Sequence, residues 1–102
     1  GADGAIGGTY GVMPELYLKI FELCKAGDYV AARKIQYAAD AIIYAMCACK
    51  GNLYAVMKAI MKIREGLDIG SVRKPLPAVV PEDMEQVKKC AGMIDEAIKA
   101  YC

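Results

Sequence analysis

This 102-residue sequence contains no histidine. The side chains that could take part in catalysis or metal binding are therefore tyrosines, lysines, cysteines and carboxylates. Histidine is the commonest metal ligand and the usual general base. A tyrosine can donate a proton where its pKa is lowered, and a desolvated lysine can form a Schiff base with a carbonyl compound. Catalysis by this chain would therefore need a tyrosine or a lysine in an unusual setting.

No tyrosine or lysine has such a setting by sequence position alone. The seven tyrosines are Tyr10, Tyr17, Tyr29, Tyr37, Tyr44, Tyr54 and Tyr101. We expect them to pack with their hydroxyls in water, and Tyr10 is the best candidate for chemistry because it lies in a glycine-rich loop. The lysines at mainly polar helical positions are Lys19, Lys34, Lys58, Lys62, Lys88, Lys89 and Lys99. We expect these lysines, and Arg64, to point outward into solvent.

Cysteines and carboxylates give no site either. Cys47 and Cys49 are two residues apart on a predicted helix, so they point about 200° apart and cannot share a metal ion. Glu82 and Asp83 fall in the first turn of a predicted helix, where negative charge is favourable. Arg73 and Lys74 could bind an anion, but we expect them to anchor their segment to a carboxylate. We therefore predict no catalytic residue, no metal site and no cofactor.

The most distinctive feature is the glycine-rich opening, GADGAIGGTYG, over residues 1–11. Its glycines let backbone N–H groups approach a ligand, and a loop before a helix offers a positive dipole end to an anion. The spacing matches neither the dinucleotide-binding glycine pattern nor the P-loop. Spacing alone therefore leaves two readings open, a ligand-binding loop and a turn-rich terminus.

Hydrophobic periodicity predicts a mainly α fold, a bundle of about four helices after a short strand or extended segment at residues 4–9. The predicted helices cover residues 14–25, about 28–49, 53–65 and a segment that begins at 81. Residues 67–80, with Pro75 and Pro77, are predicted to be a non-helical connection that wraps the surface. The second half of the helix at 28–49 is apolar nearly all round, which indicates cover on several sides.

Composition excludes several classes of protein. A net charge of +1 with intermixed signs leaves no basic stripe for a nucleic acid. The longest weakly charged stretch, residues 37–49, is too short to span a membrane. Five cysteines, an odd number at irregular spacing, favour free thiols and a cytoplasmic location. A hydrophobic content of 57% is high for so small a domain and suggests that apolar surface meets a partner.

Three blocks of sequence resemble the C-terminal part of the N-acetylneuraminate lyase family, in the dihydrodipicolinate synthase-like superfamily of pyruvate-dependent aldolases. They are GADGAIGGTYGVM at residues 1–13, GDYVAARK at 27–34 and SVRKPL at 71–76. The family fold is a (β/α)₈ barrel of about 250 residues followed by extra helices. The resemblance implies that residues 1–27 correspond to barrel strand 8 and helix 8, and residues 28–102 to the C-terminal three-helix extension.

The resemblance also implies a site. Family members cleave sialic acid to N-acetylmannosamine and pyruvate through a lysine Schiff base assisted by a tyrosine, and neither residue has a counterpart here. Ile6 corresponds to an apolar residue near the pyruvate pocket. Gly8 stands where the family usually has a serine that touches the sugar part of the substrate, and Gly11 stands where it usually has asparagine. Ile6 and Gly8 are thus predicted to line the substrate site of a whole barrel.

Two functions are supported by particular residues, and a third, a helical regulatory or ligand-binding module, has no specific residue in its favour. In the first, the chain is a C-terminal piece of such an aldolase, inactive alone, whose partner is the missing barrel portion. In the second, it is a stand-alone or designed helical bundle with a role in self-association. The apolar residues Ala41, Tyr44 and Ala48 favour the second reading, because more polar residues are expected there in the family.

Overall fold

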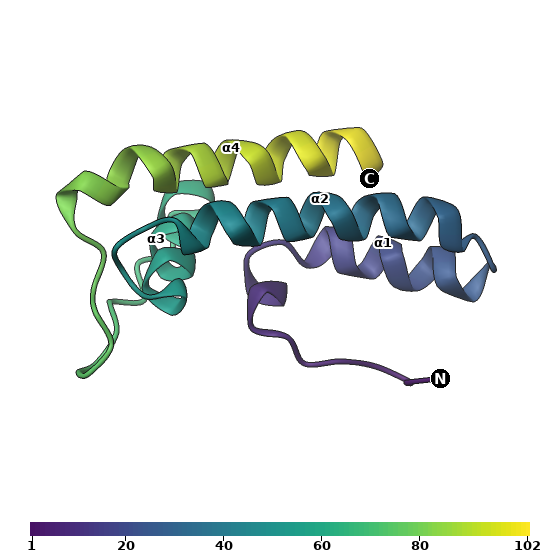
Figure 1. Cartoon of the computed structure of the whole chain (residues 1–102), viewed down its shortest axis with the longest axis horizontal. Coiled ribbons are helices and arrows are strands. Elements are labelled where there is room, and N and C mark those ends of the chain that lie inside the picture. The colour runs from purple at the N-terminus through teal and green to yellow at the C-terminus, as the bar shows by residue number, and fades with distance from the viewer.

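The computed structural model describes all of residues 1–102 and contains four α-helices and no β-strand. The elements in order are η1 (Gly8–Gly11), α1 (Pro14–Lys25), α2 (Tyr29–Cys47), α3 (Leu53–Glu65), η2 (Pro81–Asp83) and α4 (Met84–Tyr101), where η marks a 3₁₀ helix. Helices α1, α2 and α4 run along the long axis of the molecule, and α3 crosses them at one end (Figure 1). The fold is thus the predicted helical bundle.

Helix boundaries follow the local signals in the sequence. The Asp28 side chain accepts a hydrogen bond from the Ala31 N–H at 3.0 Å, and Asn52 accepts one from the Tyr54 N–H at 2.9 Å, so each caps the helix that follows it. Gly66 ends α3 with a φ of 68°, a left-handed conformation that glycine adopts without a steric penalty. The predicted bounds of α1 and α3 are confirmed, whereas α2 ends at Cys47 rather than near 49.

The strand expected at residues 4–9 does not form. Residues 1–7 have no regular secondary structure, Gly7 has extended dihedral angles, and Gly8–Gly11 form η1. A strand needs a neighbouring strand to pair its N–H and C=O groups, and this chain offers none. The alternative of an extended segment describes residues 1–7.

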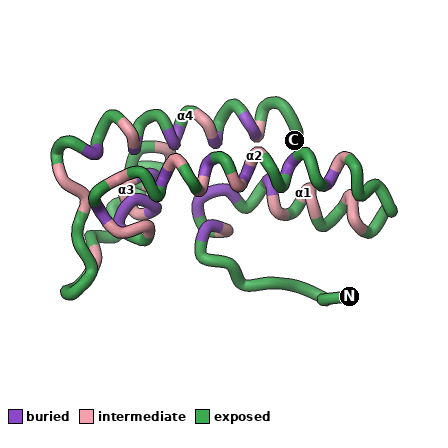
Figure 2. The backbone as a smooth tube through the Cα atoms, viewed as in Figure 1, coloured by how far each residue is buried: buried purple, intermediate pink, exposed green.

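The core lies where α2 packs against α1 and α4, and where α3 packs against α4. The inner faces of the helices are buried, whereas residues 1–8 are exposed (Figure 2). Completely or almost completely buried side chains include Leu16, Ile35, Met46, Ile60 and Ile94. None of the four helices combines the length and apolar character needed to cross a bilayer.

Candidate functional site

The glycine-rich opening is the candidate site, and its residues face two different environments. The Ile6 side chain is as exposed as in an extended peptide, at 103% of the reference area, and Gly8 is also exposed. By contrast, Thr9, Val12 and Met13 are buried. The chain therefore enters the core at η1 and leaves the preceding residues free to meet something else.

One side of this segment is held by tyrosines. A Cβ atom on Gly7 would lie only 2.6 Å from Cε1 of Tyr10, so a side chain there would require the Tyr10 ring to shift. The rings of Tyr10 and Tyr17 stack with centroids 4.1 Å apart, and the hydroxyls of Tyr17 and Thr9 are hydrogen-bonded at 2.7 Å. Burial raises the pKa of the Tyr17 phenol, which makes it a weaker acid. The two rings thus pack against each other, and Tyr17 is not a proton donor of lowered pKa.

The other side of the segment meets α3. A Cβ atom on Gly8 would lie 3.3 Å from Cε1 of Tyr54 and 3.7 Å from Cε of Met57. Tyr54 lies in the first turn of α3 and is 53% exposed. The structure therefore brings Gly8 beside Tyr54, a pairing that no spacing in the sequence indicated.

Arg64 fixes the end of the opening segment, contrary to the expectation that it points into solvent. Its Nη1 donates to the backbone carbonyl of Val12 at 2.9 Å, and its Nε donates to the Asp95 carboxylate at 2.9 Å. Only 13% of its side chain is exposed. A polar position in the last turn of a helix could not reveal this role, because both partners come from other elements.

Lysines in this structure lack the environment of a Schiff-base lysine, since none is buried. The Lys58 ammonium donates to the Ser71 carbonyl at 2.6 Å. Lys62 forms an ion pair with Asp68 at 2.9 Å, and the hydrogen bond to that carboxylate raises the pKa of Lys62. A nucleophilic amine needs a lowered pKa, so these contacts anchor the connection between α3 and η2 instead.

The connection is not held by Arg73 and Lys74, which were expected to reach a carboxylate. Neither residue forms an ion pair. The Asn52 N–H donates instead to the Pro77 carbonyl at 2.9 Å, and a Cβ on Gly51 would lie 2.9 Å from Cα of Val79. Close backbone packing thus replaces the expected ion pair.

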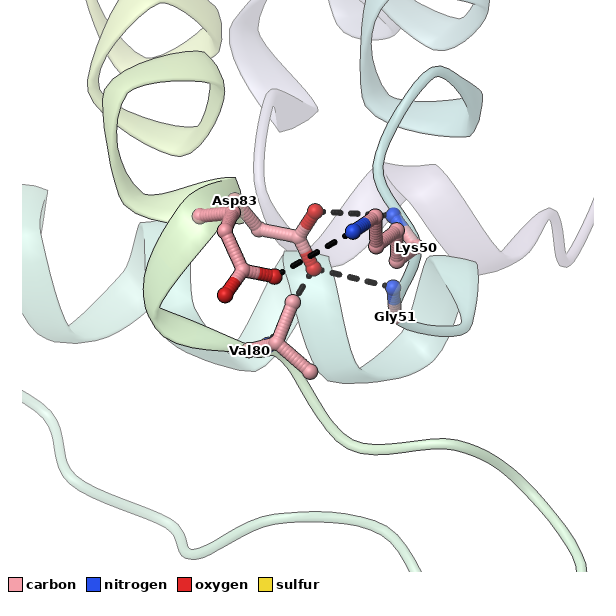
Figure 3. A network of polar contacts seen from close by, with 5 residues as sticks. Lys50, Gly51, Val80 and Asp83 are labelled. Carbon is pink, nitrogen blue, oxygen red and sulfur yellow. Dashed lines mark hydrogen bonds and ion pairs between the residues drawn. The ribbon is translucent and has the colours of Figure 1, made fainter.

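Asp83 joins the start of α4 to the turn between α2 and α3. Its carboxylate accepts hydrogen bonds from the N–H groups of Lys50 at 2.8 Å, Gly51 at 2.9 Å and Val80 at 3.2 Å (Figure 3). The hydrogen bond from the Lys50 N–H is the main reason that the pKa of Asp83 is lowered. This buried carboxylate is structural, and no group of three or more potential ligands is arranged to hold a metal ion.

An apolar groove of about 740 Å³ separates the opening segment from α1. Its lining includes Ala2 and Ala5 on one side and Leu18, Phe21 and Cys24 on the other. Leu18 is 69% exposed and Phe21 is 41% exposed, whereas Leu16 of the same helix is fully buried. The groove and the exposed Ile6 side chain, which does not line it, are apolar regions without a partner in this chain.

Comparisons with known proteins give the following matches. The model of the dihydrodipicolinate synthetase family matches residues 1–94. The chain is 63% identical over 101 residues to an N-acetylneuraminate lyase from Mediterraneibacter gnavus, a match that covers 99% of this chain and 32% of that protein. It is 37% identical over 93 residues to an N-acetylneuraminate lyase from Haemophilus influenzae, covering 91% of this chain and 30% of that protein.

Solved structures agree with the sequence matches. The whole chain superposes on the wild-type sialic acid aldolase from Ruminococcus gnavus with a TM-score of 0.98 and 63% identity, covering 34% of the aldolase chain. A catalytic lysine mutant of that aldolase gives the same TM-score and identity, with 33% of its chain covered. The chain thus spans about a third of the length of the relatives it matches and corresponds to their C-terminal portion.

Proposed function

We propose that this chain, which belongs to the dihydrodipicolinate synthetase family, completes the barrel of an N-acetylneuraminate lyase. It would also form one wall of the substrate site of that enzyme. The observation that carries the proposal is the superposition of the whole chain on a sialic acid aldolase with a TM-score of 0.98. The complete enzyme would cleave sialic acid to N-acetylmannosamine and pyruvate in the cytoplasm.

Within that barrel, residues 1–27 would supply strand 8 and helix 8, and residues 28–102 the helical extension. The extended dihedral angles at Gly7 suit a strand that pairs only when its neighbours are present. The groove between this segment and α1 would be filled by apolar side chains of the barrel portion. Exposed Leu18 and Phe21 support that occupant, because apolar side chains at a groove of this size are normally covered.

Ile6 and Gly8 would then face the substrate. In an extended segment, alternate residues point to opposite sides. Gly8 begins η1 and lies beside Tyr54 of α3. Gly7 faces Tyr10 and through it α1, so Ile6 belongs to the side away from α1. That side corresponds to the interior of a barrel whose helices form the outer layer.

The test is to join this chain to the segment that precedes the matched part in the Ruminococcus gnavus aldolase. The joined protein should cleave sialic acid and should form a covalent adduct when pyruvate is trapped with borohydride. This chain alone should form no adduct, because none of its lysines is buried. An inactive joined protein that folds, or an adduct on the isolated chain, would contradict the proposal.

A second candidate, self-association of the helical bundle, is favoured by the outer face of α2. Val30, Tyr37 and Tyr44 recur every seven residues on that face and are 68%, 64% and 77% exposed. Light scattering distinguishes the two candidates. A stable oligomer with a cooperative melting transition favours self-association, whereas a monomer that binds the barrel portion favours the first proposal.

A further inference from the structure

Tyr54 is the side chain of the helical extension that lies nearest to the position of a Cβ on Gly8, with Met57 next. Cε1 of its ring, the carbon next to the one that carries the hydroxyl, lies 3.3 Å from the position of a Cβ on Gly8. The two residues are 46 positions apart in the sequence, and α3 carries the tyrosine to this place. The ring thus lies against the segment that ends in the proposed substrate wall.

The ring of Tyr54 lies where a side chain at position 8 would need space. A separation of 3.3 Å is tighter than ordinary van der Waals contact, so a serine at position 8 would require the ring to move by a few tenths of an ångström. Glycine leaves the ring undisturbed. Position 8 thus carries no hydroxyl of its own, and the phenol of Tyr54 lies beside it.

The Tyr54 hydroxyl is also free to bind a ligand. The side chain is 53% exposed, and no group of this chain forms a hydrogen bond with its hydroxyl, whereas the Tyr17 hydroxyl is paired with Thr9. Asn52 caps the helix through the Tyr54 backbone N–H, which fixes the backbone of this residue without using its side chain. The backbone of Tyr54 is therefore fixed by the cap, and its hydroxyl has no hydrogen-bond partner within this chain.

We infer that the Tyr54 hydroxyl takes the place of the missing serine hydroxyl and hydrogen-bonds the polyhydroxylated sugar part of the substrate. The inference rests on the proposed lyase function. It makes Tyr54 a specificity-determining residue for the sugar portion, with no part in forming the Schiff base with pyruvate. A phenol reaches farther than a serine side chain and suits a hydroxyl of the sugar chain or a bridging water.

The experiment uses the joined barrel described above, with Tyr54→Phe as the test variant. This change removes the hydroxyl and keeps the ring that packs beside Gly8. In the condensation direction, the KM for N-acetylmannosamine should rise roughly three- to tenfold, the effect of losing one neutral hydrogen bond. The KM for pyruvate and the borohydride-trapped adduct should not change. Tyr37→Phe, which removes an exposed hydroxyl from the outer face of α2, is the matched control and should leave both KM values unchanged.

A rescue variant separates binding from a merely structural role. Gly8→Ser combined with Tyr54→Phe should restore much of the affinity for N-acetylmannosamine, because the half-exposed ring can move aside for the serine. If Tyr54→Phe traps pyruvate normally and leaves the KM for N-acetylmannosamine unchanged, the inference is wrong and the proposed function stands. If the joined barrel folds but traps no pyruvate, both fail.

Discussion

The turn between α2 and α3 and the glycine-rich opening both bring glycine close to another segment, but they satisfy their polar groups differently. At the turn, Asp83 receives three backbone N–H groups, and Asn52 bonds the backbone of the following connection. In the opening, residues 1–6 donate no backbone hydrogen bond that joins them to the rest of the chain. The turn is complete within this chain, whereas the opening is shaped for contacts outside it. The turn is therefore held by contacts within this chain, and the opening is the region to which the proposed function assigns the substrate wall.

The largest effect should come from the core that supports both regions. Ile94 is fully buried where α4 packs on the bundle. Ile94→Ala should destabilise the chain by about 2–5 kcal/mol, because it leaves a cavity. Urea unfolding followed by circular dichroism measures the loss. Glu96→Ala, an exposed change on the same helix, is the control, and equal midpoints for the two variants would contradict the assigned core.

Breaking the Asp83 contacts should have the next largest effect. Asp83→Asn retains one carbonyl oxygen, and its amide NH₂ would face donors, so the melting temperature should fall clearly. Glu82→Gln is the matched control, since its ion pair with Lys50 is exposed and contributes little. If both variants melt alike, the carboxylate does not hold the turn.

The same carboxylate predicts a pH dependence. The pKa of Asp83 is lowered in the folded chain, so the folded state favours the ionised form. Its stabilising contribution should be complete above the pKa of an unfolded aspartate and should disappear as the pH falls through the lowered pKa. Melting curves over the acidic range should be flatter for Asp83→Asn than for the parent chain. A parallel pH dependence in the two proteins would contradict this assignment.

Arg64 connects α3 and α4 to the end of the opening, so changing it tests how the two regions are coupled. Arg64→Lys keeps the charge but loses the two-pronged contact to Val12 and Asp95, so we expect a loss of about 1–3 kcal/mol. Hydrogen exchange should then increase at the start of α1 more than in α2. Arg33→Lys, at an exposed position of α2, should change neither property. Uniform exchange changes would mean that Arg64 supports the whole bundle rather than the opening.

The smallest effect on stability should come from Ile6. Ile6→Ser removes a fully exposed side chain, so the free energy of unfolding of this chain should change by less than about 0.5 kcal/mol. In the joined barrel the same change should raise the KM for pyruvate. A variant that melts much lower as the isolated chain would show that Ile6 packs within this chain.

Much of the fold could be predicted from local sequence, because caps and breakers act within one turn. Asp28, Asn52 and Gly66 each mark a helix end through a contact with a near neighbour. The ends of the apolar stripes were less reliable. Met84 and Tyr101 continue the stripe of α4 but are 36% and 38% exposed, because the neighbouring helices do not cover the two ends of α4.

The candidate site was predicted only in part. The resemblance pointed to Ile6 and Gly8, whose role stays a prediction, while Arg64 and Tyr54 gave no signal. Arg64 reaches Val12 across 52 positions, and periodicity records only which face of a helix is apolar. A long polar side chain at the edge of that face can lie in solvent or between elements, and only the packing of the elements decides which.

By itself the sequence determined the number of helices, most of their ends and the family, since these depend on local backbone chemistry and on residue identity. Only the tertiary structure decided that Gly7 lies against Tyr10, that Gly8 lies beside Tyr54 and that Asp83 joins the start of α4 to the turn between α2 and α3. The contacts of Gly8 with Tyr54 and of Asp83 with Gly51 join groups 46 and 32 positions apart along the chain. Their geometry is set by how the helices pack, and no short stretch of sequence records it.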